Sequence, residues 1–249
     1  MRNTFIPLSA ALTLILAISI AITGRSEARS VSTVLELFSS QGCSSCPPAD
    51  ELLKSYVARD DVLALSLPVD YWDNLGWKDT LGSPKNSQRQ YDYAHQRGDR
   101  SVYTPQIVVN GVAHVPGYDR RRIDQEIEAA NLSLRRELIT MSINSVGETI
   151  QVSVSPAKEG AQYRSGTLWL VLYSKLETVS IGAGENAGRT LSYVNVVREM
   201  MPVGMWHGDA DRITLPRADI MNRGHEGCAV LLQAGMAGPI LGAAVMDSW

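Results

Sequence analysis

The 249-residue sequence has only three cysteines, no excess of basic residues, and no convincing repeat or low-complexity segment. Three cysteines are too few for a small fold built on disulfides. Lysine and arginine number 23 against 26 aspartates and glutamates, and no basic stripe indicates nucleic acid as a partner. After the N-terminal region, no run of residues is apolar enough to span a membrane.

The long apolar run at the N-terminus has the organisation of an export signal. Arg2 precedes an apolar segment at residues 8–23, and Ser26-Glu27-Ala28 then offers small residues at positions −3 and −1 of a cleavage site. An uncleaved anchor is the alternative, but the run is shorter than the roughly 20 residues that a spanning helix needs. We therefore predict a signal peptide at residues 1–28 and a periplasmic or secreted mature chain.

The N-terminal half of the mature chain alternates strand-like and helix-like segments. In order, these are a strand at 31–38, a helix at 49–59, a strand at 61–69, a helix at 86–97, strands at 106–110 and 112–116, and a helix capped by Asp119. Asn110-Gly111 predicts a two-residue hairpin turn. A right-handed crossover would make the first two strands parallel. This order predicts a thioredoxin-like domain at residues 29–135, with an inserted segment at 70–100.

The C-terminal half instead reads as short strands separated by glycine- and proline-containing turns. The strand-like segments are 139–143, 150–154, 167–174, 189–197, 213–215, 229–233 and 240–246. Strands at such spacing are typical of an antiparallel sandwich. The predicted fold class is therefore α/β plus all-β, with a C-terminal antiparallel β-sandwich at residues 136–249.

Cys43 and Cys46 lie where the first predicted strand turns into the first predicted helix. Free N–H groups and the helix dipole favour an anion there, and a thiolate is such an anion. In an oxidising compartment the pair should rest as a disulfide. As a redox couple it needs no organic cofactor, with Cys43 attacking a partner and Cys46 resolving the mixed disulfide. A structural bridge is the alternative.

A metal site is a third interpretation of the cysteines. His225 and Cys228 have the spacing of a ligand pair, and together with Cys43 and Cys46 they would make a Cys₃His zinc site. The two pairs are far apart in sequence, and a buried Cys228 ahead of a strand is the simpler interpretation. We therefore assign no metal ligand.

Two further residues are candidates for the chemistry of the pair. Pro105, after Thr104, directly precedes the predicted hairpin. In a thioredoxin-like fold such a proline is cis and presents the preceding backbone to a partner chain. Glu36 lies inside the first strand, and it is either an outward polar residue or a semi-buried carboxylate beneath the disulfide that takes a proton from Cys46.

An aromatic and acidic loop follows the second predicted strand. Tyr71, Trp72 and Trp77 lie in this loop, which should emerge at the sheet end that carries Cys43. The three rings are candidates for binding a partner around the sulfurs, together with Thr104. Closure of the core is an equally good use of tryptophan.

Several motifs together resemble the DUF1223 family, an uncharacterised family of bacterial exported, thioredoxin-like proteins. The matching segments are residues 35–50 around the cysteines, 69–73, 75–79, 102–106, 184–191 and 195–198. The resemblance covers nearly all of the mature chain and implies fold and compartment, but no reaction. One departure is Pro68, where the family usually carries a histidine, so no role of that histidine transfers to this chain.

The sequence therefore predicts an exported thiol–disulfide oxidoreductase that acts on protein thiols or disulfides in the exported compartment. The alternative is a non-enzymatic exported binding module in which the disulfide only clamps the turn between strand and helix. The cysteine-histidine metal protein is the third hypothesis.

Overall fold

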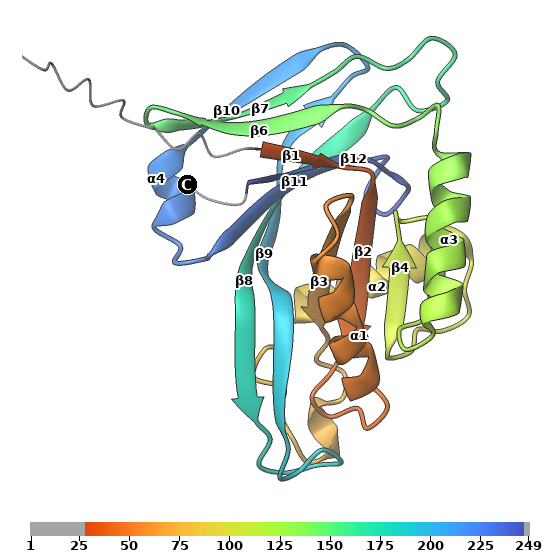
Figure 1. Cartoon of the computed structure of the whole chain (residues 1–249), viewed down its shortest axis with the longest axis vertical. Helices are drawn as coiled ribbons and strands as arrows, with labels where there is room; N and C mark the ends of the chain where they lie inside the picture. Colours follow the sequence, from red (N-terminus) through yellow and green to blue (C-terminus); the bar gives the residue numbers. More distant parts are fainter. Residues whose placement is uncertain (1–27, 247–249) are drawn as a thin grey trace, which may run out of the picture.

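The computed structural model describes residues 28–246, which form a mixed α/β fold dominated by one large, curled β-sheet with four α-helices (Figure 1). The predicted signal peptide lies outside the described residues except for Ala28. Among the described residues, no helix has both the length and the apolar character needed to cross a membrane.

The elements follow one another in an order that agrees with the segments predicted for the N-terminal half. They are β1 (Ala28–Val31), β2 (Thr33–Ser39), α1 (Pro47–Val57), β3 (Val62–Pro68), a 3₁₀ turn (Asp73–Leu75), α2 (Pro84–Arg97), β4 (Gln106–Val109), β5 (Ala113–Pro116), α3 (Arg120–Ser133), β6 (Met141–Val146), β7 (Thr149–Val154), β8 (Gly166–Ser180), β9 (Thr190–Trp206), β10 (Asp211–Pro216), α4 (Arg217–Met221), β11 (Gly227–Gln233) and β12 (Ile240–Met246).

The larger sheet joins strands from both halves of the chain, in the order β1-β12-β11-β8-β9-β3-β2-β4-β5. Strands β2 and β3 are parallel and are connected through α1, while β4 and β5 add antiparallel partners. The β4–β5 turn has positive φ at Asn110 (45°) and Gly111 (69°), as a tight two-residue hairpin requires. The predicted strand, helix, strand and hairpin are all present.

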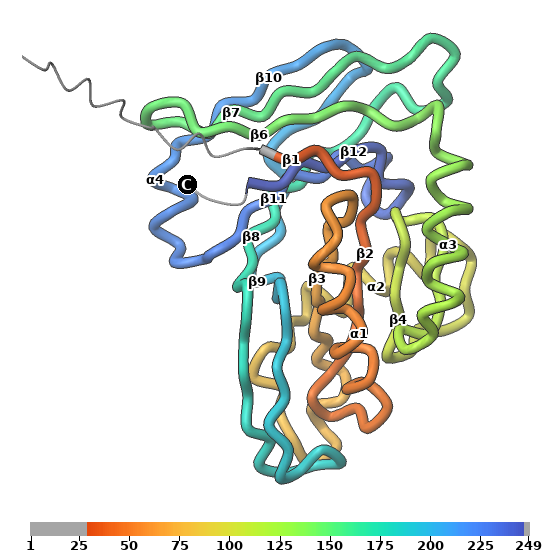
Figure 2. Tube along the Cα trace, in the orientation of Figure 1, coloured from red at the N-terminus to blue at the C-terminus, as the bar shows by residue number. Residues whose placement is uncertain are grey.

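Helices cover both faces of this part of the sheet (Figures 1 and 2): α1 and α3 lie on one face and α2 on the other. Side chains along β2 point alternately to the two faces of the sheet, which explains which of them contact α1 and α3 and which contact α2. Leu35 and Leu37 of β2 belong to the core formed with α1 and α3, whereas Phe38 belongs to the core that contains Tyr93 of α2. Glu36, between the two leucines, must therefore face α2.

The C-terminal strands are divided between two sheets. Strands β10, β7 and β6 form a separate three-stranded sheet, and its apolar side chains share a buried core with residues of β8, β11 and β12. The other C-terminal strands continue the large sheet, since β9 pairs with β3 at Ser66 and Val196. The predicted boundary near residue 135 and the separate sandwich remain predictions.

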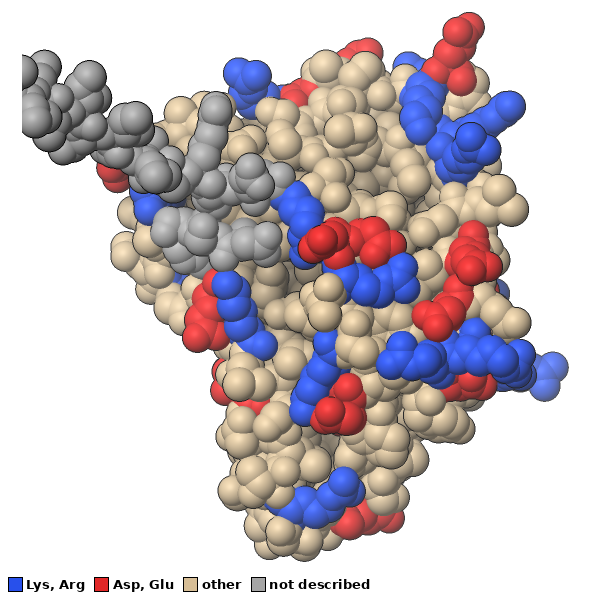
Figure 3. Space-filling model, in the orientation of Figure 1, with Lys and Arg blue, Asp and Glu red and all other residues tan. Residues whose placement is uncertain are grey.

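The β8–β9 hairpin is longer than predicted and extends to the far end of the molecule, beside α1 (Figure 1). Its outer part is a two-stranded ribbon paired from Leu176–Val194 to Ser180–Thr190. Basic and acidic side chains are interspersed over the face seen in Figure 3, and few lie near this end. The hairpin places its tip, residues 181–189, against the cysteine loop.

Candidate functional site

Cys43 and Cys46 are joined as a disulfide at the N-terminus of α1, with their Cα atoms 5.4 Å apart. Cys46 is the residue before the helix, and Pro47 and Pro48 occupy its first turn, where the missing N–H groups cost no hydrogen bond. Both cysteines are buried, with exposed fractions of 1% and 0%. Cys43, the predicted attacking residue, is therefore closed to a partner chain in this conformation.

The hairpin tip packs against the loop that carries the disulfide. The Asn186 side chain is 1% exposed and donates to the carbonyl oxygens of Gln41 and Cys43, each at 2.9 Å. The Glu185 carboxylate accepts a hydrogen bond from the Ser44 N–H at 3.2 Å. An anion is favoured at this position, before the first turn of α1, so Glu185 occupies the environment that would stabilise a thiolate.

Trp77 joins the cysteine loop to the hairpin tip. Its indole N–H donates to Gln41 Oε1 at 2.8 Å, and a Cβ added to Gly182 or Gly184 would come within 3.0 Å of Trp77. These two glycines therefore let the tip approach the ring closely. Asp79 accepts from the Gln41 N–H at 2.7 Å, and burial raises the pKa of this carboxyl.

The Thr104–Pro105 peptide bond is cis, as predicted. Pro105 is buried at the start of β4, and a Cβ on Gly117 would contact both the Pro105 side chain, at 3.3 Å, and Ala49 of α1, at 3.0 Å. Pro105 thus lies near the first turn of α1. Thr104 accepts a hydrogen bond from the Trp72 indole at 2.9 Å.

The aromatic loop contacts the cysteine loop through Trp72 and Trp77, and the rings of Tyr71, Trp72 and Trp77 are all half-buried. A Cβ on Gly42 would meet Trp72 Cβ at 3.2 Å, and the Tyr71 hydroxyl donates to Gln90 Oε1 at 3.1 Å. Each of the rings Tyr71, Trp72 and Trp77 therefore has its polar atom engaged inside the protein. Their predicted role in binding a partner remains a prediction, and their contacts show that they also hold the loop in place.

The structure does not bring Glu36 to the disulfide. Its carboxylate is fully buried on the α2 side of the sheet, where it accepts hydrogen bonds from Arg89 Nε at 2.6 Å and Arg89 Nη2 at 3.2 Å. The Tyr93 hydroxyl also donates to it. These contacts assign Glu36 to a buried ion pair, and its predicted role as a proton acceptor for Cys46 has no geometric support.

A different carboxyl group, Asp50, lies one helical turn after Cys46. It is 4% exposed, accepts a hydrogen bond from Ser39 Oγ at 2.7 Å, and has no partner for Oδ2 among the described residues. Burial raises the pKa of Asp50 to about 7; Asp79 adds to the rise, while Ser39 and Lys54 oppose it. Residues at i and i+4 share a helix face, so Asp50 lies on the same face of the helix start as Cys46.

Asp50 also lines a cavity of about 370 Å³ between the start of α1 and the start of β9. Arg189 of the hairpin and Glu51 line the same cavity, and Tyr193 of β9 is coupled electrostatically to Asp50. Sequence reasoning missed Asp50 because an acidic residue in the first turn of a helix is common and is usually exposed.

The residues proposed for a zinc site are not brought together. Cys228 is buried in β11, where burial raises the pKa of its thiol to about 12, and His225 contacts Glu199 at 3.3 Å. No group of three or more His, Cys, Asp or Glu side chains within residues 28–246 could hold a metal ion. The interpretation of Cys228 as a small apolar core residue agrees with its surroundings.

The contacts of Asn186 lead to a prediction about access to the disulfide. Asn186→Ala removes both hydrogen bonds to the cysteine loop, which contribute about 0.5–1.5 kcal/mol each. The hairpin tip should open more often, and native-state reduction by dithiothreitol should become at least about tenfold faster, the factor that corresponds to 1.4 kcal/mol. Thiol labelling during reduction measures the rate.

Asn144→Ala is the matched control, because Asn144 is exposed on β6 and its side chain donates a hydrogen bond to the nearby Ser142 hydroxyl. The control should leave the rate of reduction unchanged. An Asn186→Ala protein that is reduced no faster than the control would show that the hairpin tip does not limit access.

Comparisons with known proteins identify relatives of the whole fold. The sequence model of a family described as "Protein of unknown function (DUF1223)" matches residues 34–233. An X-ray crystal structure of a protein from Agrobacterium tumefaciens is similar at 34% identity and a TM-score of 0.77, covering 88% of this chain and 95% of that one. No curated protein matches this chain.

A second solved structure, HBP35 of Porphyromonas gingivalis, is similar at 12% identity with a TM-score of 0.57. The similarity covers 88% of this chain and 76% of that one. At this identity the likeness concerns the fold alone.

Proposed function

This chain belongs to the DUF1223 family, and on that premise we propose that it is an exported thiol–disulfide oxidoreductase whose redox couple is Cys43–Cys46. One arrangement carries the proposal: a disulfide at a helix N-terminus, followed one turn later by a buried carboxyl whose pKa is about 7. A structural clamp has no need of a proton acceptor that titrates near neutrality. The couple requires no organic cofactor, and its partners are protein thiols or disulfides.

In the reducing direction the exchange has two steps. The Cys43 thiolate attacks one sulfur of a partner disulfide, a mixed disulfide forms, and the first partner thiolate leaves and takes up a proton. Cys46 then transfers its proton to Asp50 and attacks the Cys43 sulfur, which releases the second partner thiol. Two electrons pass from the cysteine pair to the partner, and a thiol reductant in the compartment must return them. The reverse sequence oxidises a partner dithiol.

The proposal also treats one part of the fold as a thioredoxin-like unit, made of β2, α1, β3, α2, β4, β5 and α3. The order and pairing of these elements support that assignment. Pro105 and Thr104 at the start of β4 would hold an extended partner backbone beside the cysteines, in the manner of strand addition. Tyr71, Trp72 and Trp77 would contact the partner chain once the hairpin tip has moved. Export to the periplasm or the medium would follow from the signal predicted at residues 1–28.

Glutathione buffers provide the test. The mature protein should exchange its disulfide with glutathione, and its reduction potential gives the direction: about −120 mV indicates an oxidant and about −270 mV a reductant. Cys46→Ser, treated with oxidised glutathione, should retain one glutathione on Cys43, whereas Cys43→Ser should retain none or far less. Cys228→Ala controls for the third thiol. A native disulfide that resists millimolar dithiothreitol, together with no exchange activity, would refute the proposal.

The second candidate is an exported binding module with a structural disulfide, which the burial of both cysteines favours. In that case the Cys43→Ser/Cys46→Ser double variant should lose thermal stability but keep its ability to bind a partner. The oxidoreductase requires that the same variant lose all exchange with glutathione.

A further inference from the structure

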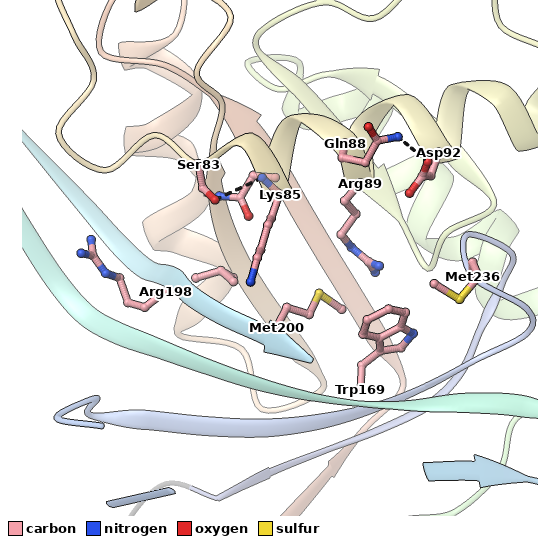
Figure 4. Close-up of a pocket in the computed structure, with 11 residues that line it drawn as sticks. Ser83, Lys85, Gln88, Arg89, Asp92, Trp169, Arg198, Met200 and Met236 are labelled. Carbon is pink, nitrogen blue, oxygen red and sulfur yellow. Dashed lines mark hydrogen bonds between the residues drawn. The ribbon is translucent and has the colours of Figure 1, made fainter. Parts of the chain in front are cut away.

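A cavity of about 210 Å³ lies between α2 and the strands β8 and β9. Figure 4 shows its composition: α2 contributes polar and charged side chains on one side, and Trp169 and Met200 form the opposite wall. Because α2 and α1 cover opposite faces of the sheet (Figure 1), this cavity is separate from the cysteine site. The proposed exchange reaction does not use it.

The strand wall of the cavity is shaped by a β-bulge. The register of β8 with β9 passes from Leu172–Glu199 directly to Tyr173–Val197, so Arg198 has no partner in the ladder. In a regular strand, neighbouring residues point to opposite faces. The bulge instead lets both Val197 and Arg198 line the cavity, and bulges of this kind commonly redirect a side chain at a functional site.

The charge around the cavity is positive. Lys85 of α2 and Arg198 of β9 both line it, and neither forms an ion pair within the described residues. Arg89 is neutralised by its bidentate pair with Glu36. The one acidic lining residue, Asp92, accepts a hydrogen bond from Gln88 at 2.8 Å. Two free cations against one carboxylate favour an anionic ligand.

The apolar wall carries a buried hydrogen-bond donor without a partner in the described part of the chain. The indole Nε1 of Trp169 is buried and has no hydrogen-bond partner among the described residues, although buried indole N–H groups normally have one. The Trp169 ring and the thioethers of Met200 and Met236 supply polarisable apolar surface, which adapts well to aromatic groups. In Figure 4 the Lys85 side chain extends from α2 toward Met200 and Trp169.

We propose that this cavity is a binding site for a small amphipathic carboxylate with an aromatic body. The ring would lie against Trp169 and Met200, and the carboxylate would be held by Lys85, with Arg198 at the edge of the cavity (Figure 4) adding to the positive potential. The cavity volume of about 210 Å³ accommodates a small molecule.

Three probes test the site on the mature protein: 3-phenylpropionate, its neutral amide, and acetate. The phenylpropionate should shift the indole N–H resonance of Trp169, assigned among the five tryptophans with Trp169→Phe, and should bind with a Kd of about 1 mM or below. The amide should bind at least about tenfold more weakly, because it lacks the charge that Lys85 and Arg198 attract. Acetate, which lacks the ring, should also bind more weakly.

The double variant Lys85→Gln/Arg198→Gln should lose about tenfold or more of its affinity for phenylpropionate and little for the amide. Lys158→Gln is the control, since Lys158 is exposed and contacts the Arg135 carbonyl at a distant loop. No shift of the Trp169 resonance by phenylpropionate at about 10 mM, or equal binding of acid and amide, would overturn the proposal. The cysteines take no part in this binding. Either outcome therefore says nothing about the disulfide-exchange reaction, which the glutathione experiment tests separately.

Discussion

Arg89→Leu should lower the free energy of unfolding by about 3–5 kcal/mol, the usual cost of removing one partner of a buried ion pair. Arg89 is 8% exposed and Glu36 is fully buried, and the guanidinium makes two hydrogen bonds to the carboxylate. Leucine leaves this carboxylate in an apolar core with only the Tyr93 hydroxyl as a donor. Urea denaturation measures the loss.

The network around Arg89 joins distant parts of the chain, which is why the effect should be cooperative. Arg89 Nη1 donates to Gln233 Oε1 at 3.1 Å, and Gln233 Nε2 donates to the Tyr93 hydroxyl at 3.0 Å. Strand β2, helix α2 and strand β11 therefore share one buried polar cluster. Loss of its central cation affects the contacts of all three elements at once.

A double-mutant cycle makes this prediction specific. Glu36→Leu/Arg89→Leu removes both charges, and the double variant should be more stable than Arg89→Leu alone, because no unpaired carboxylate remains. Arg121→Leu, on exposed α3, should change stability by no more than about 0.5 kcal/mol. If the two single effects simply add, the ion pair is not the source of the destabilisation.

A further variant, Glu36→Gln, decides between two roles for Glu36. A proton relay would make Glu36→Gln alter the pH profile of disulfide exchange. The ion pair with Arg89 instead leads us to expect a stability change with an unaltered pH profile, since Glu36 faces α2 and the cysteines lie at the start of α1.

Local patterns were enough to predict the elements around the cysteines. The Asn110-Gly111 turn depends on two neighbouring residues whose backbone preferences are strong, whereas the cis form of Pro105 was predicted from the thioredoxin-like order of the elements. The parallel pairing of β2 with β3 follows from the connection through α1. These features were therefore predictable, and the structure has them.

Contacts between distant residues were not predictable in this way. Asn186 reaches the cysteine loop across 143 residues of sequence, and Gln233 reaches Arg89 across 144. Residues 184–191 resemble a family motif, but their glycines and charged residues favour a turn with exposed charges. Nothing local in the sequence distinguishes Asp50, which the fold buries, from an ordinary acidic residue at the start of a helix.

Asp50→Asn should remove a large part of the pH dependence of stability. Below about pH 4 the carboxyl is protonated in both the folded and unfolded states. Between the unfolded pKa of 3.8 and the folded pKa of about 7, the folded state holds a proton that the unfolded state has released, so the free energy of unfolding falls as the pH rises. Above pH 7 the loss is complete, on the order of 4 kcal/mol.

The asparagine variant lacks this titration, so it should be more stable than the parent protein at pH 8, while the two should converge near pH 4. Denaturation across this pH range measures the difference. Asp209→Asn replaces an exposed carboxylate and should leave the pH profile close to that of the parent. The free energy of unfolding of the parent protein should fall between pH 4 and pH 7 relative to that of Asp50→Asn. If it does not fall, the pKa of Asp50 is not raised.

The same substitution should also slow disulfide exchange, because Cys46 must lose a proton before it attacks Cys43. Loss of a positioned base typically costs about 10²–10⁴ in rate, and we expect a decrease of about a hundredfold at pH 7. The defect should shrink as the pH rises, since water and hydroxide then deprotonate the thiol directly. Rescue at high pH would separate a role in proton transfer from a purely structural one. A variant with altered stability but normal exchange kinetics would leave Asp50 as a buried acid without a part in the reaction.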